Sequence, residues 1–199
     1  MTPSATEGPG TTNKLGILGG FQRSVAAHPD RPALRVAGEE FTYSELHRRA
    51  LALADTLERH DPDPTRWRTA VLAHRSPNAY AGVLASLYRG HAYVPLNPRF
   101  PIRRTAEMLE RSGARSVVVD AMGERVLDAV LDAHREQLLV VLPHRSDVSD
   151  LASDFPRTAS LGAASTSVRT SPSWTPPPGH RGPRPTCCLL RAAPADRRG

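Results

Sequence analysis

The chain has 199 residues, which is enough for one domain with a buried core and too few for two large domains. Its formal net charge is +6, but residues 1–156 are neutral, and the whole excess lies in residues 157–199. No apolar run reaches the roughly 18 residues that a membrane span requires, and residues 1–20 lack the pattern of a signal peptide. These features predict a cytoplasmic protein without a membrane partner.

The first elements are predicted from local patterns. We interpret residues 1–20 as a flexible leader, and we include the glycine-rich residues 16–20 in it rather than in a phosphate-binding loop, because they precede the first strand. Residues 33–43 predict two short strands in a hairpin around Gly38. Thr42 and Glu45 then form a capping-box pattern for an amphipathic helix that ends near Arg59.

From residue 68 onward, short apolar strands alternate with helices. Strands are predicted at 68–73, 92–96, 116–120 and 138–142. Helices are predicted between Ser76 and Gly90, between Pro101 and Gly113, and over residues 126–131. This alternation is typical of right-handed βαβ units and a parallel sheet that is covered on both faces. We therefore expect an α/β, doubly wound fold over residues 21–155.

No pattern of catalytic or metal-binding residues appears in the sequence. Ser44 and Ser76 lack a partnered His and Asp, so helix capping is the favoured role. Glu107 and Glu110 are expected on a solvated helix face. The histidines do not pair at metal-ligand spacing on one helix, so surface or structural roles are favoured for all eight of them: His28, His47, His60, His74, His91, His134, His144 and His180. The sequence thus predicts no catalytic, cofactor-binding or metal-binding residue.

Two segments carry a family resemblance. "FTYSELHRRALALADTL" (41–57) and "LASLYRGHAYVPLNPRFPIRRTAEMLERSGARSVVVD" (84–120) resemble the first two motifs of adenylation domains of nonribosomal peptide synthetases. Asn97 departs from the family's usual Asp and is frequent in acyl-CoA ligases of the same superfamily, whereas "AYVPL" favours the amino-acid-activating branch. The resemblance covers about residues 21–142. It identifies residues 21–155 as a partial N-terminal subdomain of an AMP-binding domain.

The resemblance implies a ligase that uses ATP and magnesium to convert a carboxylate to an acyl-adenylate. The acyl group then passes to the phosphopantetheine thiol of a carrier protein. The family's phosphate loop ends in Pro-Lys-Gly and its C-terminal subdomain supplies a lysine, but Lys14 is the only lysine here. The resemblance therefore implies a truncated enzyme that is inactive by itself and holds no cofactor. The alternative is a small α/β binding or regulatory module with a basic tail.

Residues 156–199 are rich in proline and arginine and predict a disordered tail. Its two cysteines, Cys187 and Cys188, match no zinc-ligand spacing. It has a single aromatic residue on which a base could stack, Trp174, so nucleic-acid binding is not favoured. Suitable codons can be chosen for residues 184–199. When these codons are translated from a start two bases later, they encode "AYLLPASGSTGRPKG", which resembles the family's strand and phosphate loop. We therefore predict that the reading frame shifts near residues 155–161.

Overall fold

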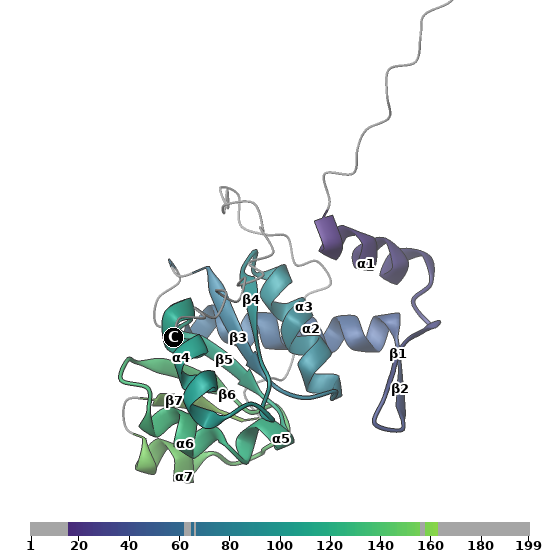
Figure 1. Ribbon diagram of the computed structural model, residues 1–199. Helices are drawn as coiled ribbons and strands as arrows, with labels where there is room; N and C mark the ends of the chain where they lie inside the picture. The colour runs from purple at the N-terminus through teal and green to yellow at the C-terminus, as the bar shows by residue number, and fades with distance from the viewer. Residues whose placement is uncertain (1–15, 62–64, 66, 156–157, 163–199) are drawn as a thin grey trace, which may run out of the picture.

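The structure is a computed structural model, and it describes residues 16–61, 65, 67–155 and 158–162 (Figure 1). The expectations for most of the basic tail, including the shifted-frame motif at 184–199, lie outside the described residues, as do Lys14 and His180. No helix within the described ranges is long and apolar enough to cross a membrane.

Five parallel strands form the central sheet in the spatial order β4-β3-β5-β6-β7. The strands are β3 (Arg68–Leu72), β4 (Ala92–Leu96), β5 (Ser116–Val119), β6 (Leu138–Val141) and β7 (Thr158–Leu161). The chain passes from β3 to β4 on one side and then crosses to β5 on the other side of β3. This change of direction confirms the doubly wound α/β fold.

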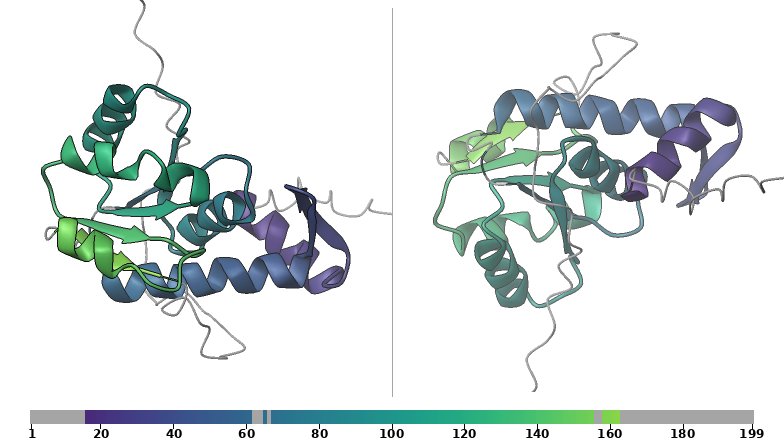
Figure 2. Two further views of the ribbon diagram at one scale, coloured as in Figure 1. Left: turned by 90° about the horizontal axis from the view of Figure 1, so that it is seen from below. Right: turned by 90° about the horizontal axis from the view of Figure 1, so that it is seen from above.

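Helices cover both faces of the sheet (Figure 2). The helices α2 (Tyr43–His60) and α3 (Pro77–Tyr88) pack on one face, and α4 (Ile102–Ser112), α6 (Leu127–Asp132) and α7 (Ser149–Asp154) pack on the other. Successive side chains of a strand point to opposite faces, so Val117 and Val119 contact the α4 side while Val118 contacts the α2 side. All four residues of β5 and of β6 are buried, which explains their nearly continuous apolar sequences.

Local capping signals in the sequence set several helix ends as predicted. The Thr42 hydroxyl accepts a hydrogen bond from the Glu45 backbone N–H, and the Glu45 carboxylate accepts one from the Thr42 backbone N–H, so the capping box is confirmed. Gly113 ends α4 with a left-handed φ of 65°, as its position predicts. The expected capping role of Ser44 is wrong, because Thr42 is the N-cap of α2 and Ser44 lies inside the helix, with its hydroxyl 3.2 Å from the Thr42 hydroxyl.

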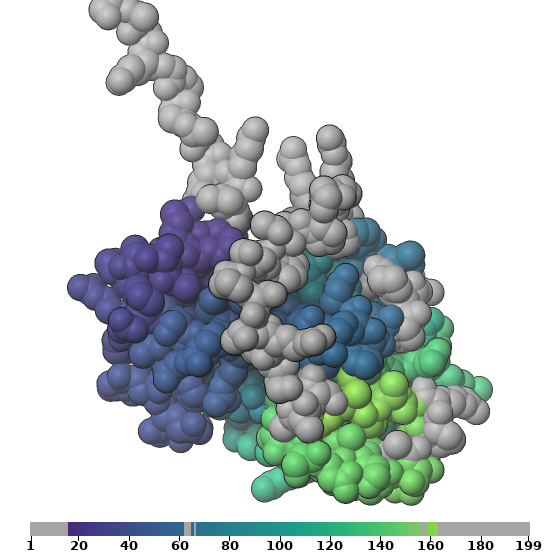
Figure 3. All heavy atoms as spheres, turned by 180° about the vertical axis from the view of Figure 1, so that it is seen from behind, coloured from purple at the N-terminus to yellow at the C-terminus, as the bar shows by residue number. Residues whose placement is uncertain are grey.

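The flexible-leader prediction is wrong for residues 16–20, which form the start of helix α1 (Gly16–Ala27). The glycines make this segment a weak helix former by propensity. Tertiary packing compensates for this weak helix propensity. The centroid of the Phe21 ring lies 5.8 Å from that of Tyr43 and 6.4 Å from that of His47. The predicted hairpin is confirmed as β1 (Pro32–Val36) and β2 (Glu39–Thr42), and it lies with α1 at one end of the molecule (Figure 1, Figure 3).

The prediction of a disordered tail from residue 156 is wrong for residues 158–161, which form β7 at the far edge of the sheet. The sequence of this strand is "TASL", which is too short and too polar to show a strand period. Its order comes from the parallel ladder with β6, where Leu138 pairs with Thr158 and Val141 pairs with Leu161. The folded unit therefore extends past the boundary expected at residue 155.

Candidate functional site

The carboxyl ends of β3 and β5 form the position where doubly wound sheets usually bind ligands. Such sheets bind at the switch point, where neighbouring strands send their connections to opposite faces. Here α3 follows β3 on one face, and the short helix α5 (Ala121–Glu124) follows β5 and leads to α6 on the other. This edge is therefore the candidate site.

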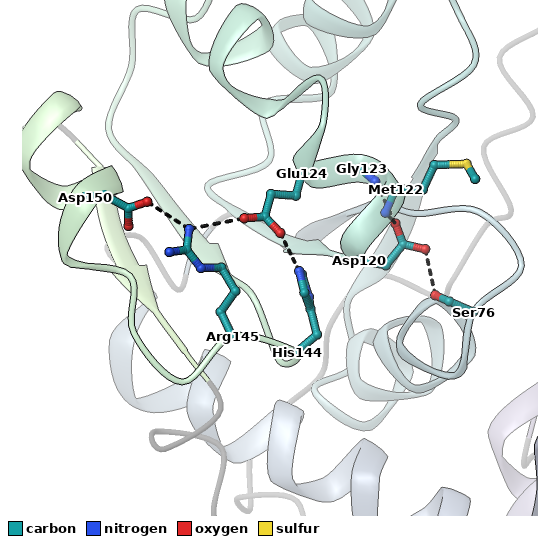
Figure 4. Close-up of polar contacts among 8 residues, drawn as sticks. All are labelled: Ser76, Asp120, Met122, Gly123, Glu124, His144, Arg145 and Asp150. Carbon is teal, nitrogen blue, oxygen red and sulfur yellow. Dashed lines mark hydrogen bonds and ion pairs between the residues drawn. The ribbon is translucent and has the colours of Figure 1, made fainter.

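Asp120 occupies the centre of this edge. It directly follows β5, and only 2% of its surface is exposed. One carboxylate oxygen, Oδ2, accepts hydrogen bonds from the His74 backbone N–H at 2.8 Å and from the Ser76 hydroxyl at 2.7 Å. The other, Oδ1, accepts from the backbone N–H groups of Met122 at 3.1 Å and Gly123 at 2.7 Å (Figure 4). One buried carboxylate thus joins the loop after β3 to the first turn of α5.

The loop after β3 is held in a specific conformation. Arg75 has a left-handed φ of 47°, which is uncommon for a residue with a side chain. Ser76 accepts from the Ala79 backbone N–H at 3.2 Å, so its predicted role as the N-cap of α3 is confirmed. It donates its own hydroxyl proton to Asp120, and His74 contacts Asp120 through its backbone rather than its ring. Ser76 therefore acts in the structure as a cap and not as a base-activated nucleophile.

The start of α5 lies directly on the end of β3. A Cβ atom at Gly123 would be 2.1 Å from the carbonyl oxygen of Leu72, so no larger residue fits without a backbone shift. The Leu72 carbonyl oxygen also accepts the backbone N–H of Asp120 at 3.2 Å. Asp120 is the N-cap of α5, and for this reason its carboxylate lies within reach of the N–H groups of Met122 and Gly123.

A second group of charges connects the loop after β6 to the neighbouring helices. Glu124 accepts hydrogen bonds from His144 Nε2 at 2.6 Å and from the Arg145 guanidinium at 3.1 Å. Arg145 also donates to Asp150 at 3.0 Å, and this hydrogen bond holds the pKa of Asp150 below its ordinary value (Figure 4). These partly exposed contacts tie α5, the β6–α7 loop and α7 together.

The residues at this edge do not fit the phosphate groups or the magnesium ion that the family resemblance implies. Phosphate sites in such folds use free backbone N–H groups and positive charge. Here the N–H groups of Met122 and Gly123 already donate to Asp120, and Asp120 and Glu124 would repel a phosphate. Both Asp120 oxygens accept protein donors, and the described residues contain no group of three or more His, Cys, Asp or Glu that could hold a metal.

A buried ion cluster lies at the opposite, amino end of the sheet. The side chains of Arg89 and Asp61 are each 1% exposed and form an ion pair at 2.7 Å. Arg89 also donates to Glu58 at 3.0 Å and to the Thr69 hydroxyl at 3.2 Å. Arg89 matched the family motif in the sequence, but its buried role was not predicted, because its partners come from the end of α2 and from β3.

Four of the described histidines have surface or structural environments. His28 and His60 are exposed, and His91 is buried with its ring 3.2 Å from the Thr69 hydroxyl. His47 Nδ1 lies 2.6 Å from the Tyr88 hydroxyl, and burial lowers the pKa of His47 and raises the pKa of Tyr88 to about 12. Tyr88 therefore stays protonated at neutral pH, and its hydroxyl forms a hydrogen bond with His47 Nδ1.

Glu107 and Glu110 are both exposed on α4, as predicted, and Glu107 forms an ion pair with Arg103. Sequence reasoning did not identify Asp120. The available signal was an acidic residue placed directly after the apolar strand "SVVV", at the strand end that faces the usual ligand position.

The sequence profile of AMP-binding enzymes matches residues 21–185. Tyrocidine synthase 3 from Brevibacillus parabrevis is 39% identical over 101 residues, which are 51% of this chain and 2% of the synthase. This chain therefore spans a small part of that relative.

Solved structures agree in fold. The adenylation domain AlmE of Vibrio cholerae, in complex with glycyl-adenosine-5'-phosphate, superimposes with a TM-score of 0.63 at 25% identity, covering 82% of this chain and 30% of that one. The structure of IdnL7 gives a TM-score of 0.58 at 35% identity, covering 71% of this chain and 27% of that one. The resemblance to adenylation domains inferred from residues 41–57 and 84–120 is confirmed.

Proposed function

Because the chain belongs to the family of AMP-binding enzymes, we propose that its folded part is the scaffold of a domain that adenylates an amino acid. In the proposed full reaction, a carboxylate attacks the α-phosphate of ATP to give an acyl-adenylate and pyrophosphate. A carrier-protein thiol then takes the acyl group and releases AMP. The glycyl-adenylate bound to AlmE supports an amino acid as the substrate class.

The observation that carries this proposal is the closed polar network around Asp120. A site that binds a nucleotide needs unpaired donors aimed at the ligand. At the carboxyl edge of this sheet, the donors of the β3–α3 loop and of α5 are taken by Asp120, and Arg145 is held by Glu124 and Asp150. This arrangement supports a role in holding strand ends and loops in place, while ATP and magnesium are bound by other parts of an adenylating domain.

We further propose that the 199-residue chain alone does not activate amino acids. The phosphate loop ending in Pro-Lys-Gly supplies donors to charge that develops in the transition state, and loss of one such donor typically costs about a hundred- to a thousandfold in rate. No such loop is present in the sequence, and Lys14 is the only lysine.

Amino-acid-dependent exchange of labelled pyrophosphate into ATP tests this proposal. The purified chain should show no exchange with any of the proteinogenic amino acids above a control without protein. A version extended in the shifted reading frame to the full length of the family should show exchange with at least one. Reproducible exchange by the 199-residue chain would overturn the proposal, and an inactive but folded extended version would contradict the adenylating scaffold.

A further inference from the structure

A basic patch with an exposed apolar centre surrounds the start of α4. We define it as Arg99, Ile102, Arg103 and Arg104, which follow directly from the edge strand β4 (Figure 1). The three arginines are exposed, and the side chain of Arg103 is 91% exposed. Ile102 is 42% exposed and is one of three large apolar side chains that are exposed among the described residues. Positive charge and exposed apolar surface therefore lie within six consecutive residues, 99–104.

The stability of α4 does not explain this patch. Cations in the first turn of a helix oppose the macrodipole and typically cost about 0.3–1 kcal/mol each. The first turn of α4 contains Arg103 and Arg104 but no acidic residue, and its N-cap, Pro101, makes no side-chain capping hydrogen bond. Exposure of Ile102 also forgoes the free energy that burial would provide. Apart from the i,i+4 ion pair of Arg103 with Glu107, none of these features stabilises the helix.

Two of the three arginine side chains are nevertheless held in place by a neighbour. Arg103 Nε donates to Glu107 at 2.9 Å. The Arg104 guanidinium carbon lies 4.6 Å from the centre of the Phe100 ring. The Asn97 side chain accepts the Arg99 backbone N–H at 2.9 Å and orders the turn before the helix. Such ordering reduces the entropy that a partner has to overcome on binding.

The Arg99 and Arg104 guanidinium groups have no carboxylate partner in the described part of the chain. Arginine binds carboxylates through two parallel hydrogen bonds, so it is suited to acidic protein surfaces. We propose that the basic patch docks an acidic segment of a partner protein, whose carboxylates surround an apolar side chain that contacts Ile102. This inference goes beyond the proposed function and does not depend on it.

Two other occupants fit the patch less well. The basic tail beyond residue 162 carries six arginines and one aspartate, so its charge has the wrong sign. Single-stranded nucleic acid is bound through aromatic rings with free faces on which bases stack. At this patch the Phe100 ring is covered by Arg104 and offers its face to a cation instead. An exposed isoleucine also favours a protein partner over a phosphate backbone.

A labelled synthetic peptide that repeats the sequence Glu-Glu-Leu-Glu serves as the probe, and its binding to the full chain is followed by fluorescence anisotropy. The double variant R99E/R104E should bind it at least about tenfold more weakly, a loss of about 1.4 kcal/mol. The matched control, R31E/R125E, reverses two exposed arginines elsewhere and changes the net charge equally. It should bind nearly as well as the unaltered chain, and circular dichroism should show that both variants are folded.

The apolar part of the proposal has its own test. The variant Ile102→Ser, or a peptide with serine in place of leucine, should weaken binding several-fold without a change of charge. Equal losses in R99E/R104E and R31E/R125E would show that only net charge matters and would overturn the proposal. Tighter binding of a labelled single-stranded oligonucleotide than of the peptide at the same patch would also overturn it, in favour of nucleic acid.

Discussion

At the scale of single residues, Asp120 shows how a buried charge is stabilised without a cation. Its two oxygens accept four hydrogen bonds, two of them from residues that precede it by 44 and 46 positions. The sequence predicted the capping role of Ser76, because a cap and its helix are adjacent in the chain. It did not predict the role of Asp120, because the donors of the β3–α3 loop reach it only when β3 and β5 pair.

We expect Asp120→Asn to lower the free energy of unfolding by about 2–3 kcal/mol. The Asn amide replaces one carboxylate oxygen, an acceptor, with an NH₂ group, which would face the N–H or O–H donors that now bind Asp120. Hydrogen bonds to charged groups are worth about 1.5–3 kcal/mol. Urea denaturation followed by circular dichroism gives the value. Asp128→Asn, on the exposed surface of α6, should stay within about 0.5 kcal/mol of the unaltered chain. Similar small effects from both variants would show that the Asp120 network contributes little.

At the scale of elements, the close contact between α5 and β3 depends on Gly123. We expect Gly123→Ala to lower the melting temperature strongly, because the added Cβ would lie 2.1 Å from the backbone oxygen of Leu72, and overpacking of this kind costs about 1–3 kcal/mol or more. Gly20→Ala is the matched control. Gly20 lies in α1, and outside its chain neighbours and the nearby helix backbone no atom lies within 4 Å of its Cβ position, so alanine should stabilise the helix by up to about 1 kcal/mol. A neutral Gly123→Ala would mean that α5 does not lie on β3 as described.

Two of the elements that sequence reasoning missed, α1 and β7, share a physical cause. Each has weak intrinsic propensity, through glycines in α1 and a short polar sequence in β7. Both are ordered by contacts that are distant in sequence: the Phe21 ring packs against α2, and β7 pairs with β6. The elements predicted correctly, such as α2 and β5, carry caps or apolar runs that are readable within a single window.

At the scale of the whole molecule, β7 moves the boundary of the folded unit to residue 161 or beyond. We expect limited trypsin digestion to cleave first after Arg169 and Arg181, because the composition of residues 163–199 predicts a segment that cannot offset its ordering entropy. Arg157 directly precedes β7, and pairing of β7 with β6 should delay cleavage there. Mass spectrometry of early products identifies the cut sites. An early product ending at Arg157 would contradict the place of β7 in the stable core.

The sequence by itself determined the fold class, the helix caps of α2 and α3, the parallel strands β3 to β6, and the adenylation-domain family, because all of these depend on patterns within a few tens of neighbouring residues. Tertiary structure alone decided that α1 and β7 are ordered, that Arg89 and Asp61 are buried together, and that Asp120 closes the carboxyl edge of the sheet. The reason is that each of these features joins segments through strand pairing or helix packing, and the free energy of such contacts belongs to no single stretch of chain.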